Sequence, residues 1–303
     1  MARTRVSFDS AGIEIATHLY TPDSPAAGRR PALVVGHPGT GVKEQTSGTH
    51  AQLMAERGFV TLAFDAAHQG ESGGLPRGLE DPAQRVEDFK AAVSYLTTRD
   101  EVDPGRIGLL GICASGGYSL AATGGDHRVK AVAAVCTAEP ARQFRYGADG
   151  SQDPAVFRAL LDAAAQARTR AALGEDPGVM TMFPDTAEQA GALGGEHGVE
   201  GWEYYCGPRG HHERSAKYLA WDSIDKMASC DVFRAVPLIA PASTSLVQPA
   251  AKSGTPLAAA MVEARPSGLT PSAAARSATV SAYSRAVVTT SSNCRWKERK
   301  RGP

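Results

Sequence analysis

Short apolar runs alternate with amphipathic segments along the first 240 residues, and this alternation constrains the fold more than any other feature. Apolar runs of strand length occupy residues 32–36, 59–64, 107–111 and 129–137, and segments of helical character lie between them. Parallel neighbouring strands need crossover connections of this length, which are usually helices. The pattern therefore predicts an α/β fold with a mostly parallel sheet that is covered on both faces.

Terminal signals place individual elements within this pattern. Residues 6–20 indicate an opening hairpin, and residues 45–57 predict a helix that ends at Gly58. Asp81 and Pro82 occupy the N-cap and first-turn positions of a second helix. The apolar face of that helix follows at helical spacing, with Val86, Phe89, Val93 and Leu96. Both helices are long enough to connect parallel strands.

The alternation lapses between about residues 139 and 228, and we interpret this stretch as a helical cap inserted over one end of the sheet. Residues 158–173 have helical character, and the remainder mixes glycine, proline and charged residues. Five aromatic residues of this stretch are expected either to line an apolar pocket or to pack the cap on the core, namely Trp202, Tyr204, Tyr205, Tyr218 and Trp221. The predicted core with its cap spans residues 1–240.

The composition changes near residue 241. From there to Pro303, alanine, serine, threonine and proline fill 35 of 63 positions, and nine lysines and arginines accompany only two acidic residues. Residues 238–241 resemble the approach to a further strand, but the prolines and serines that follow do not continue it as an apolar run. Residues 241–303 are therefore interpreted as a low-complexity tail, disordered or encoded in a shifted reading frame, which leaves the final strands of the sheet doubtful.

Charge and composition exclude several function classes. Lys and Arg total 32 and Asp and Glu total 32, so no net charge steers the chain to nucleic acid or to an anionic membrane. No apolar run has the length of a signal peptide or of a membrane span, which predicts a cytoplasmic protein. The five scattered cysteines indicate neither a disulfide framework nor a paired metal site. A small molecule is the expected partner, and the oligomeric state stays open.

A strand that runs through glycines into a helix carries the predicted chemistry. A strained turn of this kind exposes a nucleophile and needs small residues two positions before and two positions after it. Cys113 satisfies this rule with Gly111 and Ser115, and Ser115 satisfies it with Cys113 and Gly117. We prefer Cys113 because it lies two residues after the glycine that closes the strand. A buried cysteine in a purely structural turn is the remaining interpretation.

Four segments together resemble the α/β-hydrolase superfamily, in the branch of dienelactone hydrolases and bacterial acyl esterases. They are GHPGTG at 36–41, FDAAHQGESGG at 64–74, VDPGRIGLLGICASGGY at 102–118 and RGHHERS at 209–215. The resemblance covers about residues 5–240. It implies a Ser or Cys nucleophile, an acid and a His that relays the proton, in that order along the chain, with no cofactor and no metal.

The resemblance also implies an oxyanion hole. The N–H group of Ala114 would be one donor, and because Pro38 has no N–H, the second donor would be Gly39 or Thr40. The other polar residues of these motifs are interpreted as structural, namely His37, Asp65, Asp103 and Arg106.

The C-terminal half of the implied machinery is missing. The family places its acid and its His after the last strands, yet the chain has no His after His212 and no Asp after Asp231. Glu263 is the one acid at a suitable position, but no strand is predicted before it. A shifted reading frame explains the loss. Alternatively, another His completes the site, with His212 as the preferred base and His211 or His68 as further candidates.

The sequence thus predicts a hydrolase of carboxylic esters, thioesters or lactones that passes the acyl group through the nucleophile to water. The alternative is a non-catalytic protein of the same fold that binds a small hydrophobic molecule, or the inactive product of a damaged gene. A metal cluster of Cys206, His211, His212 and Glu213 is less favoured, because its spacing matches no common zinc pattern.

Overall fold

A mixed sheet of eight strands forms the centre of the molecule, in the order β1-β2-β4-β3-β5-β6-β9-β10. The computed structural model describes residues 1–25, 28–147, 150–239, 243–247 and 261–262. The strands of this sheet are β1 (Ala2–Ser10), β2 (Ile13–Thr21), β3 (Arg30–Gly36), β4 (Val60–Phe64), β5 (Val102–Ile112), β6 (Val129–Val135), β9 (Ser243–Val247) and β10 (Met261–Val262). The strands β4, β3, β5, β6 and β9 run parallel, so the predicted α/β class is confirmed.

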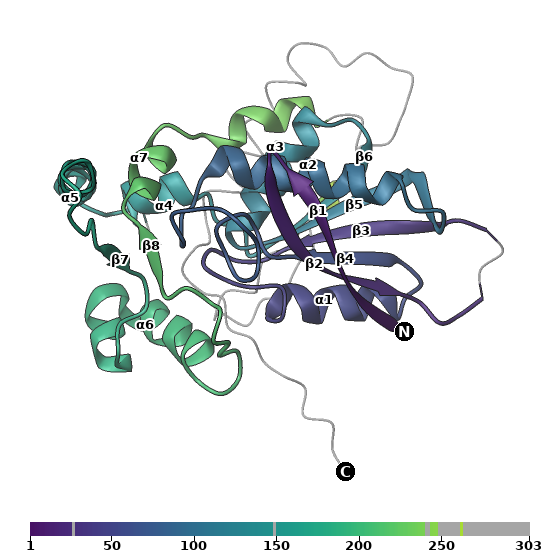
Figure 1. Ribbon diagram of the computed structural model, residues 1–303, viewed down its shortest axis with the longest axis horizontal. Helices are drawn as coiled ribbons and strands as arrows, with labels where there is room; N and C mark the ends of the chain where they lie inside the picture. The colour runs from purple at the N-terminus through teal and green to yellow at the C-terminus, as the bar shows by residue number, and fades with distance from the viewer. Residues whose placement is uncertain (26–27, 148–149, 240–242, 248–260, 263–303) are drawn as a thin grey trace.

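Helices cover both faces of the sheet (Figure 1). Helix α1 (Thr46–Ala55) packs on one face, and α2 (Pro82–Thr97), α3 (Ala114–Gly125) and the 3₁₀ helix η1 (Val232–Leu238) pack on the other. Successive residues of a strand point to opposite faces. Leu110 accordingly joins Ala51 of α1 in one buried cluster, while Leu109 joins Phe89 of α2 in the other.

The predicted helix ends follow from local hydrogen bonding. The Asp81 side chain accepts hydrogen bonds from the N–H groups of Ala83 and Gln84, which confirms it as the N-cap of α2. Gly58 adopts φ +94 after α1 and donates its N–H to the carbonyl of Ala55. A left-handed backbone at this position costs the least free energy when the residue is glycine, which has no Cβ. Both signals were readable from the sequence because they depend on neighbouring residues alone.

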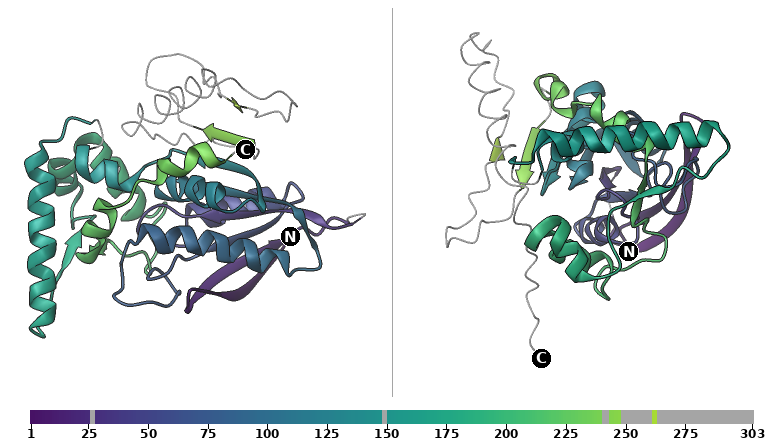
Figure 2. Two further views of the ribbon diagram at one scale, coloured as in Figure 1. Left: turned by 90° about the horizontal axis from the view of Figure 1, so that it is seen from above. Right: turned by 90° about the vertical axis from the view of Figure 1, so that its left-hand side faces the viewer.

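The stretch interpreted as a cap lies at one end of the sheet, with α5 at its outer edge (Figures 1 and 2). Its elements are α4 (Pro140–Tyr146), α5 (Pro154–Ala172), β7 (Val179–Thr181), α6 (Ala187–Tyr205), β8 (Tyr218–Ala220) and α7 (Asp222–Ala228). A separate buried cluster, which includes Leu219, Ile224 and Met227, holds it together. The expectation of a purely helical cap was incomplete, because β7 and β8 form a small antiparallel sheet. Strands of three residues are too short to show an alternating pattern.

The tail contributes two strands that the sequence analysis did not predict. Strand β9 pairs in parallel with β6, from Ser243 opposite Ala131 to Val247 opposite Val135, and β10 pairs antiparallel with β9. Without β9, the edge of β6 would present unpaired backbone N–H and C=O groups, and backbone pairing does not require an apolar run. Strand β10 also directly precedes Glu263, contrary to the prediction, although Glu263 and most of the tail lie outside the described residues.

Residues 238–241, interpreted as the approach to a strand, do precede β9, which begins at Ser243, although Ala240 and Pro241 lie outside the described residues. Leu238 ends the 3₁₀ helix η1, and Ile239 is its C-cap. Val232, at the start of η1, and Ile239 are buried against α3 and the sheet. Ile239 therefore serves the packing of this helical turn, whereas Leu238 is largely exposed.

Candidate active site

Cys113 occupies the sharp turn between β5 and α3. Its backbone adopts φ 56 and ψ −118, a conformation that a residue with a side chain rarely adopts. The N–H of Cys113 donates to the carbonyl of Val135 at 3.0 Å, and its own carbonyl accepts from the N–H groups of Gly116 at 2.9 Å and Ala138 at 3.1 Å. The side chain is partly exposed. The turn thus presents Cys113 at the carboxyl end of the parallel strands.

Small residues permit this turn because the helix lies very close to the strand. A Cβ atom added to Gly111 would lie 2.1 Å from the carbonyl oxygen of Ser115 and 2.4 Å from Oγ of Ser119. A Cβ atom added to Gly116 would lie 2.7 Å from Oγ1 of Thr137. Neither position has room for a side chain, so the glycines identified in the sequence are required by packing.

Ser115 is buried below the turn. Its hydroxyl donates a hydrogen bond of 2.5 Å to the carbonyl of His37 and accepts one of 3.0 Å from Nη2 of Arg85. The hydroxyl proton of Ser115 is therefore engaged in a hydrogen bond to a backbone carbonyl. This geometry joins the end of β3 to α3, and it is the geometry of a structural serine.

The loop after β3 lies against the turn. Pro38 and Gly41 close it with a backbone hydrogen bond of 3.0 Å, and Thr40 adopts φ 57. A Cβ atom added to Gly39 would lie 3.9 Å from Cβ of Ala114, so the two loops are in contact there. Ala114 is the first residue of α3, and first-turn N–H groups have no acceptor within their own helix. The residues expected to form an oxyanion hole are thus brought together.

His37 is buried with both ring nitrogens engaged. Nδ1 lies 2.6 Å from the carbonyl of Pro38, and Nε2 accepts from the N–H of Ala66 at 3.0 Å, which assigns the proton to Nδ1. Burial, together with the Arg85 guanidinium, holds the pKa of His37 well below its ordinary value. A neutral ring whose acceptor nitrogen is already occupied is not poised to take a proton from a nucleophile.

A buried ion pair fixes the loops after β3 and β4. Nζ of Lys43 lies 2.7 Å from Asp65 and 2.6 Å from Glu71, and Asp65 also accepts from the backbone N–H of Lys43 at 2.7 Å. Burial alone would lower the pKa of Lys43, but these carboxylates outweigh it and raise the pKa. Lys43 therefore stays charged, and Asp65 has the structural surroundings expected for it.

Arg85 of α2 connects the pieces beneath the turn, and the sequence analysis missed it. Nη2 donates to the carbonyl of His37 at 3.0 Å as well as to Ser115, and Nη1 lies 3.1 Å from Nε2 of His37. Nε lies 3.3 Å from Glu80, and both charged side chains are 3% exposed. The position of Arg85 in the sequence could have revealed it. Arg85 precedes Phe89 by four residues and therefore lies on the apolar face of the helix.

The RGHHERS segment docks on the loop that carries Gly39 and Thr40. Ser215 donates its hydroxyl to the carbonyl of Thr40 at 2.8 Å, and Arg214 lies 2.9 Å from Glu44. His212 is partly exposed within this segment, and its Nδ1 accepts from the N–H of Arg214 at 3.3 Å. Of the candidate bases, His212 therefore belongs to a segment that touches the expected oxyanion loop.

The other candidate bases have different surroundings. His211 is exposed to solvent. His68 is buried, lies with Nδ1 3.1 Å from the carbonyl of Pro76, and has its pKa lowered chiefly by burial. Its ring also packs against Gly74, where an added Cβ would lie 2.7 Å from Nδ1. His68 thus contributes to the folding of its own loop.

The aromatic residues of the cap serve packing where their contacts are defined. Nε1 of Trp202 donates to the carbonyl of Pro184 at 2.7 Å, and the hydroxyl of Tyr204 lies 2.8 Å from Oγ1 of Thr46 on α1.

Within the described ranges, no three His, Cys, Asp or Glu side chains are grouped so as to hold a metal ion. In the same part of the chain, none of the helices combines the length and the apolarity that a membrane crossing requires.

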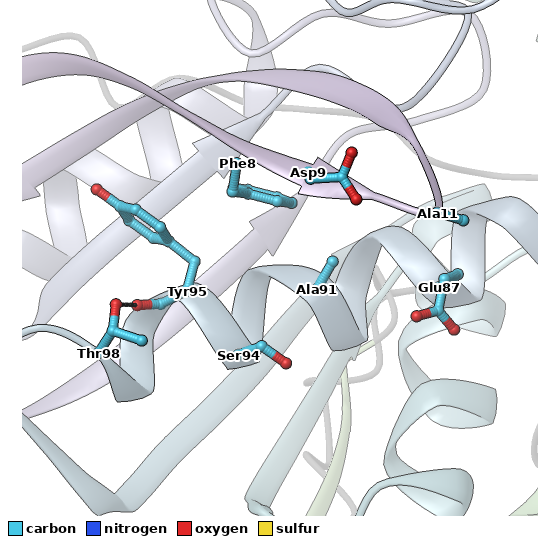
Figure 3. Close-up of a pocket in the computed structure, with 8 residues that line it drawn as sticks. All are labelled: Phe8, Asp9, Ala11, Glu87, Ala91, Ser94, Tyr95 and Thr98. Carbon is cyan, nitrogen blue, oxygen red and sulfur yellow. Dashed lines mark hydrogen bonds between the residues drawn. The ribbon is translucent and has the colours of Figure 1, made fainter.

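A surface hollow of about 420 Å³ lies between β1 and α2 (Figure 3). It is lined by Phe8, Asp9, Ala11, Glu87, Ala91, Ser94, Tyr95 and Thr98. Phe8 and Tyr95 stack there with ring centroids 5.8 Å apart. None of the predicted site residues contributes to this hollow, so it is distinct from the turn at Cys113.

Comparison with known proteins identifies relatives across most of the chain. The family model of the X-Pro dipeptidyl-peptidase (S15 family) matches residues 11–191. The uncharacterized protein YcjY of Escherichia coli (strain K12) is 37% identical over 237 residues, which are 77% of this chain and 76% of that protein. The thiohydrolase aneE of Aspergillus aculeatus is 34% identical over 125 residues, which are 41% of this chain and 38% of that protein.

Solved structures share the fold. The crystal structure of the hypothetical protein PA2218 from Pseudomonas aeruginosa superposes with a TM-score of 0.74 at 34% identity, over 82% of this chain and 77% of that chain. The α/β hydrolase GrgF from Penicillium sp. sh18 superposes with a TM-score of 0.69 at 24% identity, over 82% of this chain and 80% of that chain. The second likeness concerns the fold alone.

Proposed function

Because the chain belongs to the S15 family within the α/β-hydrolase superfamily, we propose that it hydrolyses carboxylic esters, thioesters or lactones with Cys113 as the nucleophile. The observation that carries this proposal is the backbone of Cys113, whose left-handed φ of 56 between β5 and α3 holds a reactive side chain at the carboxyl end of the sheet. The acyl carbon of a small molecule is the expected target.

The reaction proceeds in two stages. The sulfur of Cys113 attacks the carbonyl carbon, and the N–H groups of Ala114 and of Gly39 or Thr40 stabilise the negative charge that develops on the carbonyl oxygen. The alcohol or thiol then takes up a proton and leaves, or in a lactone remains as a hydroxyl at the other end of the acyl chain, and the acyl group stays on Cys113. Water releases this acyl group as a carboxylic acid and restores the thiol. In this proposal His212 moves the protons.

The surroundings of the two candidate nucleophiles favour Cys113 over Ser115. The Cys113 side chain is partly exposed, whereas Ser115 is buried and bonded to His37 and Arg85. Attack by Ser115 would require both of its hydrogen bonds to break first. The likeness to a protein named thiohydrolase supports thioesters as one substrate class, and a thiolate is a suitable nucleophile for acyl transfer.

One observation favours a second candidate function. The chain has no His after His212, although the family relays the proton through a His near the C-terminus. Without an effective base, the same pocket would bind an acyl compound and react at most once. This second candidate is a non-catalytic binding protein of the α/β-hydrolase fold, or the inactive product of a damaged gene.

The test is an assay with p-nitrophenyl acetate on the purified chain, followed through the first turnover and into the steady state. We expect sustained release of nitrophenol that Cys113→Ala abolishes, together with covalent labelling of Cys113 by an acylating probe. His212→Ala should lower turnover by orders of magnitude, with His211→Ala as the matched control. A burst of one equivalent without turnover would instead identify the binding protein, and labelling that survives Cys113→Ala would exclude Cys113.

A further inference from the structure

Two cysteines end neighbouring parallel strands at the same level of the sheet. Strands β5 and β6 pair with Ile112 opposite Val135, so the next residues of the two strands are Cys113 and Cys136. Both residues leave their strand with a left-handed backbone, at φ 56 for Cys113 and φ 48 for Cys136. Both cysteines therefore have a positive φ directly after neighbouring strands.

The hydrogen bonds of Cys113 reach to both sides of Cys136. The N–H of Cys113 donates to the carbonyl of Val135 at 3.0 Å, and its carbonyl accepts from the N–H of Ala138 at 3.1 Å. In a parallel sheet, the N–H and the carbonyl of one residue bond to the residues just before and just after its neighbour on the adjacent strand. That neighbour then lies directly beside it. In a regular ladder the residue directly after Cys136 would donate to the Cys113 carbonyl, but here Ala138 donates, so Thr137 is one extra residue. One extra residue on one strand, next to a residue of unusual φ, is the arrangement of a β-bulge.

The spacing of such neighbours suits a disulfide. Adjacent strands lie about 4.8 Å apart, and the Cα atoms of bonded cysteines usually lie about 4.4 to 6.8 Å apart. Cys113 and Cys136 are both partly exposed, so an oxidant from solvent reaches them. We propose that Cys113 and Cys136 form a reversible disulfide in the presence of a hydroperoxide, and that this bond switches the nucleophile off.

The chemistry balances with hydrogen peroxide as the oxidant. The thiolate of Cys113 attacks the peroxide bond, which gives a sulfenic acid on Cys113 and releases hydroxide. The thiolate of Cys136 then attacks that sulfur, so that an S–S bond forms, the S–O bond breaks and the oxygen leaves as hydroxide. Overall, two thiols lose two electrons and two protons, and hydrogen peroxide becomes two water molecules.

The disulfide would protect the enzyme as well as silence it. A sulfenic acid without a resolving thiol is oxidised further to sulfinic acid, which thiol reductants do not reverse. With Cys136 beside it, Cys113 would stop at the disulfide and return to the thiol on reduction. The regulatory role rests on the proposed function of Cys113, whereas formation of the bond does not depend on turnover.

Trypsin separates the two cysteines, which makes the bond directly measurable. Cleavage after Arg106, Arg128, Lys130 and Arg142 leaves Cys113 in the peptide 107–128 and Cys136 in the peptide 131–142. The reduced full chain is treated with one equivalent of hydrogen peroxide, alkylated and digested without reductant. We expect a mass equal to the two peptides joined by one disulfide, which dithiothreitol removes. Cys206→Ser, a cysteine of the cap, should leave this product unchanged.

The variant Cys136→Ser tests the switch. In the wild-type chain, peroxide should abolish hydrolysis and dithiothreitol should restore it, whereas Cys136→Ser should start active and stay inactive after excess peroxide. A sulfenic acid on Cys113 that dimedone traps in the wild-type chain, with no linked peptides, would overturn the proposal. Equal recovery of wild type and Cys136→Ser would also overturn it. Linked peptides in a chain that never hydrolyses ester would support the disulfide and count against the proposed function alone.

Discussion

Nη2 of Arg85 and Oγ of Ser115 are joined by a buried hydrogen bond of 3.0 Å. The bond connects the first half of α2 to the first turn of α3, 30 residues later in the chain. Because the same guanidinium nitrogen also donates to the carbonyl of His37, one cation holds the end of β3 and the start of α3 in a fixed relation. These are the elements that present the expected oxyanion donors and Cys113.

Ser115→Ala should destabilise the chain without removing the nucleophile. The substitution deletes one hydrogen bond to a charged group and one to a carbonyl, both buried, at a cost of about 1–3 kcal/mol. Urea unfolding measures this loss, and covalent labelling of Cys113 should persist. Ser119→Ala, which removes a bond of 2.9 Å to the carbonyl of Gly116 in the same helix, should cost less. Loss of labelling in Ser115→Ala would instead favour Ser115 as the nucleophile.

Arg85→Met should be strongly destabilising because it leaves Glu80 buried without its cation. Removal of one partner from a buried pair costs about 3–5 kcal/mol, and both side chains here are 3% exposed. The double variant Arg85→Met with Glu80→Gln should recover part of that loss, since it removes the unpaired charge. Arg85→Lys should keep the charge but lose the guanidinium fork that reaches His37, Ser115 and Glu80 together. Additive losses in the double variant, measured by urea unfolding, would show that the two side chains do not interact.

The stability of the fold should fall as the pH is lowered below about 6.5. Folded His37 is neutral because burial, and then Arg85, depress its pKa, while unfolded His37 takes up a proton near pH 6.5. The stability that depends on neutral His37 is complete above that pH and is lost as the pH falls toward the folded pKa. His18 and His68, whose pKa values are lowered chiefly by burial, act in the same direction.

Unfolding in urea between pH 8 and pH 5 measures this dependence. A single histidine changes the unfolding free energy by up to about 1.4 kcal/mol per pH unit. The slope of the unfolding free energy against pH gives the number of protons taken up on unfolding. His37→Gln should lower that number by about one, whatever its effect on stability at pH 8. An unchanged slope would mean that His37 is protonated in the folded chain.

Gly111→Ala should disrupt the turn at Cys113. The new Cβ would lie 2.1 Å from the backbone oxygen of Ser115, which belongs to a helix and does not move freely. Overpacking of this kind costs about 1–3 kcal/mol or more, and it should also abolish labelling of Cys113. Gly125→Ala at the other end of α3 is the control, because its Cβ would meet only the flexible end of Lys90 at 3.5 Å. Thermal unfolding and labelling of both variants separate the two cases.

The sequence by itself determined the elements whose signals are local. The N-cap at Asp81, the helix stop at Gly58 and the strand-to-helix turn at Cys113 depend on neighbouring residues, and each is found at its expected position. The parallel sheet also followed, because apolar runs separated by helices leave few other arrangements. The final strands did not, since β9 pairs through its backbone with β6 and needs no apolar pattern.

The tertiary structure alone decided which polar residues meet. Arg85 and Ser115 lie on different helices with β5 between them, and no local pattern relates their side chains. The same holds for Cys113 and Cys136, which become neighbours only because β5 and β6 pair in one particular register. Contacts of this kind depend on the free energy of the whole packed core, so spacing along the chain does not reveal them.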